Sequence, residues 1–187
     1  MRPRAVIDLI CREIQSALAL IDDEEIETVT DYILNNKGRK FFVMGVGRVM
    51  LMLQAFAKRL NHVGIACYVV GETTIPSIGA QDILIAGSGS GETSTTINTA
   101  KLAKKAGAEV LLITATDDSS LRKLARYSLK IPSPTKLHSP GEPTSSQPMT
   151  NLFEQCLLVA LDAISILLQQ RLNVTESVMW QRHSNLE

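Results

Sequence analysis

The chain has 187 residues, 45% of them hydrophobic, which is enough to bury the core of one domain. Lysine plus arginine and aspartate plus glutamate both total 19, so there is no overall field to attract nucleic acid or an anionic membrane, and we expect neither as a partner. No stretch approaches the roughly 18 apolar residues of a spanning helix, and we expect a cytoplasmic protein. Three widely spaced cysteines, each in an apolar pattern, predict buried thiols rather than a disulfide or a metal site: Cys11, Cys67 and Cys156.

Helices and strands alternate along most of the chain. Two N-terminal helices are predicted within about 5–36, the second opened by a run of four acids that suits a helix dipole. Strands are then predicted at 40–45, 66–70, 83–86, 109–114 and 127–131, with helices at 49–61, 95–106 and 119–125. Short apolar strands joined by amphipathic helices predict an α/β fold, a doubly wound parallel sheet of about five strands flanked by helices. Ligands gather at the carboxyl ends of the strands in such sheets.

The last third of the chain begins with a loop and ends with a helix. Residues 132–150 carry five prolines and almost no apolar periodicity, which predicts a functional loop or a flexible lid. A single apolar helix is predicted over 151–172, and it must bury itself against the rest of the chain or another subunit. With its polar tail, this C-terminal region spans about 151–187. We therefore predict one domain over 1–187.

The turn after the third predicted strand is the most informative motif. Ile83–Ala86 run into Gly87-Ser88-Gly89-Ser90-Gly91-Glu92-Thr93 and then into a helix. Glycines let the backbone approach an anion, Ser88, Ser90 and Thr93 offer hydroxyls, and the helix start offers N–H groups and a positive dipole end. No lysine follows the last glycine, so this is no P-loop, and it predicts a phosphomonoester site. The alternative is a helix start that merely uses these residues as caps.

A second glycine turn follows the first predicted strand. Gly45-Val46-Gly47-Arg48 begins a partial dinucleotide-binding pattern, but Met50 stands at the third glycine position, so that interpretation is weak. Arg48 can instead reach a ligand's phosphate or hydroxyls as a charge-assisted donor, or it can cap a surface loop.

Glu154 and two histidines complete the candidates. Glu154 lies in the first turn of an apolar helix directly after the proline-rich loop, where a partly desolvated carboxylate can act as a proton-transfer base. The alternative is an acid that balances the helix dipole. His62 and His183 are candidates for acid catalysis or for contact with sugar hydroxyls, although a lone histidine is more often structural.

Taken together, these motifs resemble the 6-phospho-3-hexuloisomerases, which belong to the SIS-domain sugar-phosphate isomerases. The resemblance covers nearly the whole chain. The serine-rich turn is common to SIS domains, whereas Val-Gly-Glu-Thr and the C-terminal motif narrow it to this group. It is carried by Gly45-Val46-Gly47-Arg48, Arg59-Leu60-Asn61-His62-Val63-Gly64, Val69-Val70-Gly71-Glu72-Thr73, Gly87-Ser88-Gly89-Ser90-Gly91-Glu92-Thr93, Gln147-Pro148-Met149, Leu152-Phe153-Glu154-Gln155, and Arg182-His183 with Asn185-Leu186-Glu187.

The resemblance implies interconversion of 3-hexulose 6-phosphate and fructose 6-phosphate. This is the second step of formaldehyde fixation by the ribulose monophosphate route, and it implies a phosphorylated sugar as substrate. No metal or organic cofactor is expected, and a homo-oligomer, usually a tetramer, is implied. The carbonyl moves between C3 and C2, so one base can pass a proton between the two carbons through a cis-enediol(ate).

Roles for individual residues follow from the same resemblance. It implies Glu154 as the base, while Ser88, Ser90 and Thr93 hold the phosphate and so place the far carbonyl carbons against the carboxylate. The rest of the pocket is implied to come from Gly47, Arg48 and His62. His183, supplied by a neighbouring subunit, is the candidate for protonating the substrate oxygens.

One departure and two alternatives accompany the resemblance. The family pattern at the first turn is Gly-x-Gly-Arg-Ser-Gly, whereas Val49 and Met50 here remove a hydroxyl and, we expect, add bulk where the ligand approaches. The chain can then be an isomerase of another phosphorylated sugar, or a non-catalytic SIS module that binds a sugar phosphate and regulates a partner. Direct DNA binding is not expected, since the residues before the first strand carry no basic recognition face.

Overall fold

The computed structural model describes residues 2–138 and 140–186. Met1, Ser139 and Glu187 lie outside the described residues, and with them one position of the 132–150 loop and the last residue of the C-terminal motif. The helices are α1 (Pro3–Leu18), α2 (Asp23–Asn35), α3 (Arg48–Val63), α4 (Ser94–Lys105), α5 (Asn151–Arg171) and α6 (Glu176–Gln181). The strands are β1 (Phe41–Met44), β2 (Cys67–Val69), β3 (Ile83–Gly87), β4 (Glu109–Thr114) and β5 (Tyr127–Lys130).

The strands form one parallel sheet in the order β2-β1-β3-β4-β5. The predicted doubly wound α/β fold is therefore confirmed. Strands β1 and β3 are neighbours in the sheet, with Met44 opposite Ala86, so their carboxyl ends lie side by side. From β1 the chain passes to β2 on one side and then to β3 on the other. This reversal is the topological switch point, where open α/β sheets bind their ligands.

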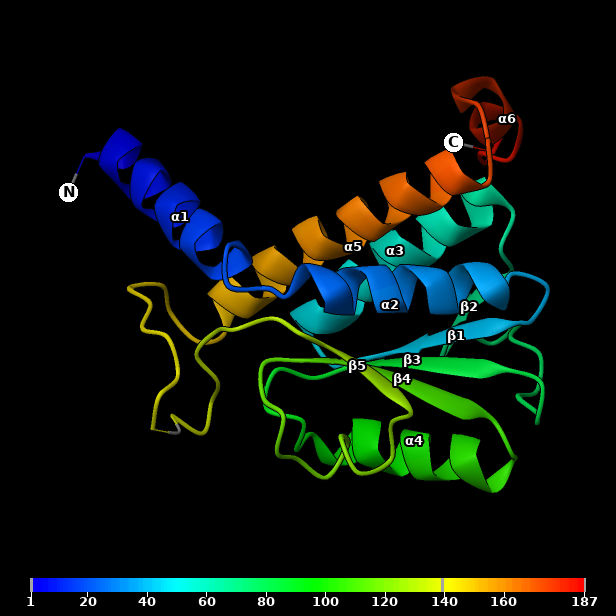
Figure 1. Cartoon of the computed structure of the whole chain (residues 1–187), viewed down its shortest axis with the longest axis horizontal. Coiled ribbons are helices and arrows are strands. Elements are labelled where there is room, and N and C mark those ends of the chain that lie inside the picture. Colours follow the sequence, from blue (N-terminus) through cyan, green and yellow to red (C-terminus); the bar gives the residue numbers. More distant parts are fainter. Residues whose placement is uncertain (1, 139, 187) are drawn as a thin grey trace.

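Helices cover the two faces of the sheet unequally. Figure 1 shows α1, α2, α3 and α5 on one side and α4 on the other. The alternating side chains of each strand feed both layers: Phe41 and Val43 of β1 belong to the larger apolar cluster, and Phe42 and Met44 to the smaller one. The three central strands, β1, β3 and β4, are buried on both faces almost throughout, which explains their nearly continuous apolar runs, while the edge strands β2 and β5 are only partly buried.

Helix α5 is the central helix of the larger layer. It packs against α1, α2 and α3. Its length and mean hydropathy of 1.7 meet the usual test for a membrane span, contrary to the expectation from the sequence, but 56% of the tested window is buried inside the protein. A long apolar helix can be either a membrane span or the core helix of a folded domain, and burial of this extent is what a core helix requires.

Two predicted elements differ in the structure. The helix expected at 119–125 is absent, and turns occupy these residues. The amide of Leu121 donates to the carbonyl of Gly91 (3.2 Å), so this segment is tied to the glycine-rich turn, and its own backbone bonds, such as the Ala125 amide to the Leu121 carbonyl (3.1 Å), form single turns rather than a helix. Conversely, α6 lies partly within the stretch interpreted as a polar tail. Thr175 begins it by accepting a hydrogen bond from the amide of Val178 (3.4 Å).

The cysteines follow the prediction in two cases of three. Cys67 and Cys156 are buried, and burial raises the pKa of their thiols to about 12 and about 11. Cys11 is exposed, so the prediction of a buried thiol there was wrong. The reason is that α1 extends from the body of the protein and buries only its inner side (Figure 1).

Candidate functional site

The glycine-rich turn lies at the carboxyl end of β3, beside the end of β1. Thr93 occupies the N-cap position of α4, yet its hydroxyl makes no cap bond and instead pairs with the Ser88 hydroxyl at 2.9 Å. The Ser90 hydroxyl is buried and accepts a hydrogen bond from the amide of Glu92 (3.3 Å). The alternative of a simple helix cap is thereby disfavoured, because Thr93 and Ser88 direct their hydroxyls to each other at the helix start.

Gly91 shapes this turn. Its φ of +63° lies in the left-handed region, and a Cβ there would sit 2.1 Å from the Ser119 hydroxyl oxygen. Three further bonds fix the turn from the next loop: the Thr114 hydroxyl and the Ala115 amide donate to the carbonyl of Gly89 at 3.2 and 3.0 Å, and the Ser120 amide donates to the Glu92 carboxylate at 2.6 Å. The turn is thus preformed and held by the end of β4.

The first glycine turn has a similar backbone requirement. Gly47 precedes α3 with a φ of +61°. Val49, however, points away from the solvent: it is 9% exposed, and Cβ atoms placed on Gly45 or Gly87 would lie 3.0 Å from its Cγ1. Met50 packs against the smaller apolar cluster. The expectation that Val49 adds bulk where a ligand approaches was therefore wrong, because its side chain fills space beneath the ends of β1 and β3.

Glu154 sits in the first turn of α5 with its side chain 9% exposed. Its carboxylate accepts a charge-assisted hydrogen bond from the Arg48 guanidinium and a second bond from the Thr150 hydroxyl at 3.2 Å. Arg48 remains half-exposed, so one side of the pair faces solvent. The structure therefore brings together Arg48 from the first turn and Glu154 from a helix 106 residues later.

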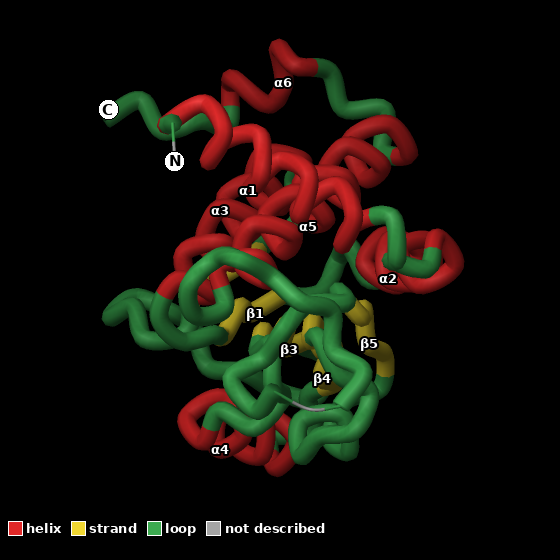
Figure 2. Tube along the Cα trace, turned by 90° about the vertical axis from the view of Figure 1, so that its left-hand side faces the viewer, coloured by secondary structure: helices red, strands yellow, loops and turns green. Residues whose placement is uncertain are grey.

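The start of α5 also touches the glycine-rich turn. A Cβ on Gly89 would lie 3.3 Å from the ring of Phe153, the residue before Glu154. Three segments thus converge at the same edge of the sheet: the turn after β1, the turn after β3 and the beginning of α5. Figure 2, which faces this end of the molecule, shows the strand ends surrounded by loops.

His62 and His183 lie elsewhere in the same chain. His62 is in the last turn of α3, and about 21 Å of helix separates it from Arg48 at 1.5 Å per residue. The two imidazole rings stack with centroids 5.2 Å apart, and Trp180 packs on His183 at 5.2 Å. They line a cavity of about 650 Å³ between α3, α5 and α6. Figure 1 shows α6 beside the last turns of α5, whereas Glu154 belongs to the first turn of that helix. Within one copy, the structure does not bring either histidine to the glycine-rich turn.

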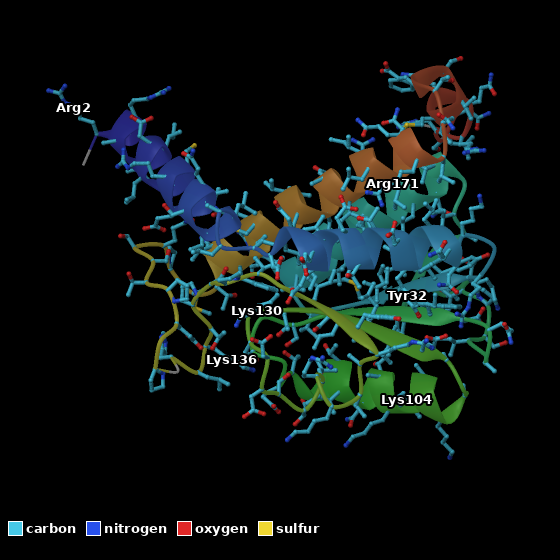
Figure 3. All side chains as sticks on the ribbon, in the orientation of Figure 1. Arg2, Tyr32, Lys104, Lys130, Lys136 and Arg171 are labelled. Carbon is cyan, nitrogen blue, oxygen red and sulfur yellow. The ribbon has the colours of Figure 1, made fainter. Side chains whose placement is uncertain are left out.

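The proline-rich loop adds a second hollow near Glu154. Its volume is about 550 Å³, and its lining includes Lys136, His138, Ser145 and Thr150. Lys136 is labelled in Figure 3, where it extends from the loop on the side at which α5 begins. Thr150 therefore borders this hollow and also hydrogen-bonds Glu154.

No metal-ligating cluster is found in the part of the chain that the structure describes, taking groups of three or more His, Cys, Asp and Glu side chains. The polar groups at the converging segments are hydroxyls, backbone amides, one arginine and two carboxylates, of which Glu92 accepts the bond from the Ser120 amide. This donor set suits an anion with adjacent hydroxyl or carbonyl oxygens.

Sequence reasoning missed Thr150 and the residues that support the turn from β4. Thr150 precedes Glu154 by four residues at a helix start, and this spacing was a usable signal. Thr114 and Ser119 carry no such signal, since their contacts to the glycine-rich turn depend on the pairing of β3 with β4.

The sheet order and the hydroxyl-lined turn define a class: a doubly wound α/β protein whose switch point carries a turn of a kind suited to a small anionic ligand. The sequence pattern of the SIS domain matches residues 33–163. The whole chain is 36% identical over 187 residues to a 3-hexulose-6-phosphate isomerase of Bacillus subtilis (strain 168), all of which is covered. A protein of the same name from Mycobacterium gastri is 38% identical over 181 residues, covering 97% of this chain and 89% of that one.

A solved structure agrees with these relatives. The hypothetical protein from Methanococcus jannaschii, whose crystal structure was described as inferring a function of 3-hexulose-6-phosphate isomerase, has a TM-score of 0.81 and 31% identity over 98% of this chain and 99% of that one. The chain belongs to the 3-hexulose-6-phosphate isomerase family of SIS-domain proteins. The resemblance seen in the sequence is thus confirmed.

Proposed function

We propose that this chain is an isomerase that interconverts 3-hexulose 6-phosphate and fructose 6-phosphate through a cis-enediol(ate), with Glu154 as the base. The observation that carries the proposal is the convergence of a buried carboxylate with a hydroxyl-lined turn at the sheet's switch point. Family membership at 36–38% identity over nearly the full length supports the choice of substrate.

The chemistry needs one proton moved between neighbouring carbons. Glu154 takes the proton from C2, beside the C3 ketone, and the electron pair forms the C2–C3 double bond of the enediolate. Return of that proton from Glu154 to C3, with transfer of the proton on the C2 oxygen to the C3 oxygen, then gives the C2 ketone and the C3 hydroxyl. A single carboxylate on one side of the substrate serves both carbon steps, and general base catalysis of this kind is worth about 10²–10⁴-fold in rate.

The turn after β3 holds the phosphate at the other end of the sugar. The hydroxyls of Ser88 and Thr93 are hydrogen-bonded to each other. A phosphate oxygen can accept from these hydroxyls in place of that bond without a shift of the backbone. Ser90 retains its hydrogen for a donor bond while its oxygen accepts from Glu92. A bound phosphate orients the carbonyl carbons toward Glu154, so the reacting groups are already in position when the proton is transferred.

Arg48 completes this half of the pocket beside Gly47. It contacts Glu154 and keeps a half-exposed face, so substrate oxygens can share its donors. As negative charge develops on the enediolate oxygens, a guanidinium beside them stabilises it. Arg48 is therefore assigned to orient the base and to stabilise the intermediate.

A second copy of the chain supplies the histidines. His62 and His183 are stacked at the opposite end of α3 and α5, so they serve the proton transfers between the C2 and C3 oxygens only if a neighbouring subunit presents them. Exposed Ile166 and Trp180 border the same cavity and suit burial against another subunit. We propose a homo-oligomer, a tetramer, acting in the cytoplasm in formaldehyde fixation, with no metal or organic cofactor.

Mixing inactive variants tests the shared site. Glu154→Gln and His62→Ala are each expected to lose turnover, and subunit exchange between them should restore part of it, because some sites then combine an intact Glu154 with an intact His62. Two copies of Glu154→Gln with different tags, mixed in the same way, are the control. Absence of recovery despite proven exchange would show that both residues act within one subunit or that His62 is structural.

Turnover tests the reaction itself. Purified protein is incubated with enzymatically generated 3-hexulose 6-phosphate, and fructose 6-phosphate is followed with a coupled dehydrogenase. We expect robust formation by the unaltered chain. Binding of fructose 6-phosphate without any turnover would instead favour an isomerase of another phosphorylated sugar or a non-catalytic SIS module that regulates a partner.

A further inference from the structure

Glu13 of α1 makes an unusual set of contacts for a carboxylate near a helix surface. Its two oxygens accept three hydrogen bonds from one segment of the proline-rich loop: from the Ser145 hydroxyl at 2.6 Å, the Ser146 amide at 2.8 Å and the Gln147 side-chain amide at 3.1 Å. Asp8, on the same helix, pairs with Arg4 of its own helix instead. Glu13 thus clamps residues more than 130 positions away.

The clamped segment leads directly to Glu154. Ser145 and Gln147 line the hollow of about 550 Å³ that Thr150 also borders, and Thr150 donates to Glu154. The amide of Asn151 donates to the carbonyl of Pro148 (3.3 Å), so the chain between the clamp and α5 is itself turned and short. Only three positions along the chain therefore separate Gln147 of the clamped segment from Thr150.

Apolar packing does little to hold this part of the loop. Residues 140–150 are all half-buried or exposed, and Met149 is 91% exposed. Helix α1 is in contrast fixed on α5, with Ile14 and Leu18 packed against the larger core cluster. Figure 1 shows the loop beneath α1 at the end of the molecule where α5 begins. The polar clamp therefore connects a segment with little buried apolar surface to a packed helix.

The charge of Glu13 is suited to this role. Partial burial opposes ionisation, but the hydrogen bonds from Ser145, Ser146 and Gln147 outweigh it and lower the pKa of Glu13 below its usual value. The carboxylate is thus ionised at neutral pH, and bonds donated to a charged acceptor are stronger than neutral ones.

We propose that Glu13 is a positioning residue: from α1 it holds segment 145–147, and through that segment Thr150, where the loop orients Glu154 toward bound substrate. This role rests on the proposed function. Helix α1 lies outside the residues that match the SIS domain. The proposal gives this helix a part in the reaction, which is to hold the loop beside Glu154, and the glycine-rich turn does not provide it.

Amide hydrogen exchange and kinetics together test the clamp. In Glu13→Ala, and less strongly in Glu13→Gln, the Ser146 amide should lose its exchange protection, while amides in α4 are unchanged. The turnover number should fall about tenfold through misplacement of the base. Equilibrium binding of fructose 6-phosphate, which the glycine-rich turn dominates, should change less than twofold. Asp8→Asn is the matched control and should leave both measurements at their original values.

A second variant distinguishes positioning from general destabilisation. Ser145→Ala should reproduce part of the loss in turnover, and the double variant with Glu13→Ala should lose less than the two single losses multiplied together. Unchanged Ser146 exchange in Glu13→Ala would overturn the clamp, and full turnover with a released loop would overturn its role in catalysis. An inactive unaltered chain would overturn the proposed function instead, and the exchange measurement would still decide whether the clamp exists.

Discussion

Two carboxylates of this protein, Glu109 and Glu154, each accept hydrogen bonds from arginine, and we assign them different roles. Glu109 begins β4 and accepts hydrogen bonds from the Tyr32 hydroxyl at 3.0 Å, Arg39 at 2.9 Å and Arg126 at 2.8 Å. Glu154 lies where the strands end and accepts from Arg48 and Thr150. In Figure 3, Tyr32 lies toward the opposite end of the molecule from Lys136, which belongs to the loop beside Glu154.

The difference lies in what surrounds each pair. The carboxylate of Glu109 is occupied by hydrogen-bond donors from within the protein. These contacts connect α2, β4 and the start of β5. Glu154 has two such donors, and the start of its helix touches a turn of hydroxyls and backbone amides, since a Cβ on Gly89 would lie 3.3 Å from the ring of Phe153. An ion pair with arginine is therefore no sign of a catalytic residue by itself, and the chemistry of the neighbouring turn is the distinguishing feature.

Among changes to the glycine-rich turn and the Glu109 cluster, the largest loss should follow from breaking the turn. Gly91→Ala forces a Cβ onto the Ser119 hydroxyl at a left-handed φ, so the turn must move. We expect kcat/KM to fall about a hundredfold, because misplacement of the phosphate misplaces the reacting carbons. Gly38→Ala, where a Cβ meets nothing within 4 Å, is the control. Wild-type kcat/KM in Gly91→Ala would show that the turn does not bind the substrate.

Removing single hydroxyls should act next most strongly. Ser88→Ala is expected to weaken equilibrium binding of fructose 6-phosphate about tenfold, since a hydrogen bond to a charged group contributes about 1.5–3 kcal/mol. Ser90→Ala should weaken it in the same direction. Thr99→Ala serves as the control, because that hydroxyl is bonded to the Thr95 carbonyl of its own helix. Calorimetric affinities of both serine variants that equal the control would remove them from the site.

The Glu109 cluster should show the opposite behaviour. Glu109→Gln weakens three bonds at a partly buried site, so the free energy of unfolding should fall by about 2 kcal/mol while kcat per folded molecule stays the same. Urea denaturation and turnover measured on one preparation check both statements. A loss of kcat without a loss of stability would reverse the contrast with Glu154.

Acid should act on the structural carboxylates with a smaller and graded effect. Partial burial raises the pKa of Glu109, but the hydrogen bonds from Arg39 and Tyr32 outweigh this effect and lower that pKa below its usual value. A hydrogen bond from the Ser120 amide lowers the pKa of Glu92. Carboxyls with lowered pKa values contribute stability that is present above their unfolded value near 4.5 and is lost as pH falls through the folded values. Melting temperature should be level between pH 5.5 and 7 and fall below about 4.5. A melting temperature that rises on acidification would contradict this assignment.

The sequence was most informative where structure is local. A run of apolar residues followed by glycines and hydroxyls predicts both the end of β3 and an anion site, because strand, turn and helix start are neighbours in the chain. The alternation of strands and helices likewise predicts a parallel sheet. The switch point between β1 and β3 required the strand order, which depends on packing between distant segments.

The features that the sequence did not predict depend on contacts between distant segments. The pairing of Arg48 with Glu154 and the clamp of Glu13 on the loop join segments more than 100 residues apart. Val49 was misjudged because its direction depends on how α3 leaves β1, and the turn at 119–125 because Leu121 bonds to Gly91. The separation of His62 from Arg48 follows from helix length alone, and was predictable from the expected helix at 49–61.

The central claim is that Glu154 moves the proton between C2 and C3. Its most direct test is the reaction in D₂O, followed by NMR, with Glu154→Gln and Glu109→Gln in parallel. We predict that the unaltered chain and Glu109→Gln place solvent deuterium on C3 of fructose 6-phosphate, while Glu154→Gln does so about a thousandfold more slowly. Exchange at C3 by Glu154→Gln at the rate of the unaltered chain would contradict the assignment of the base.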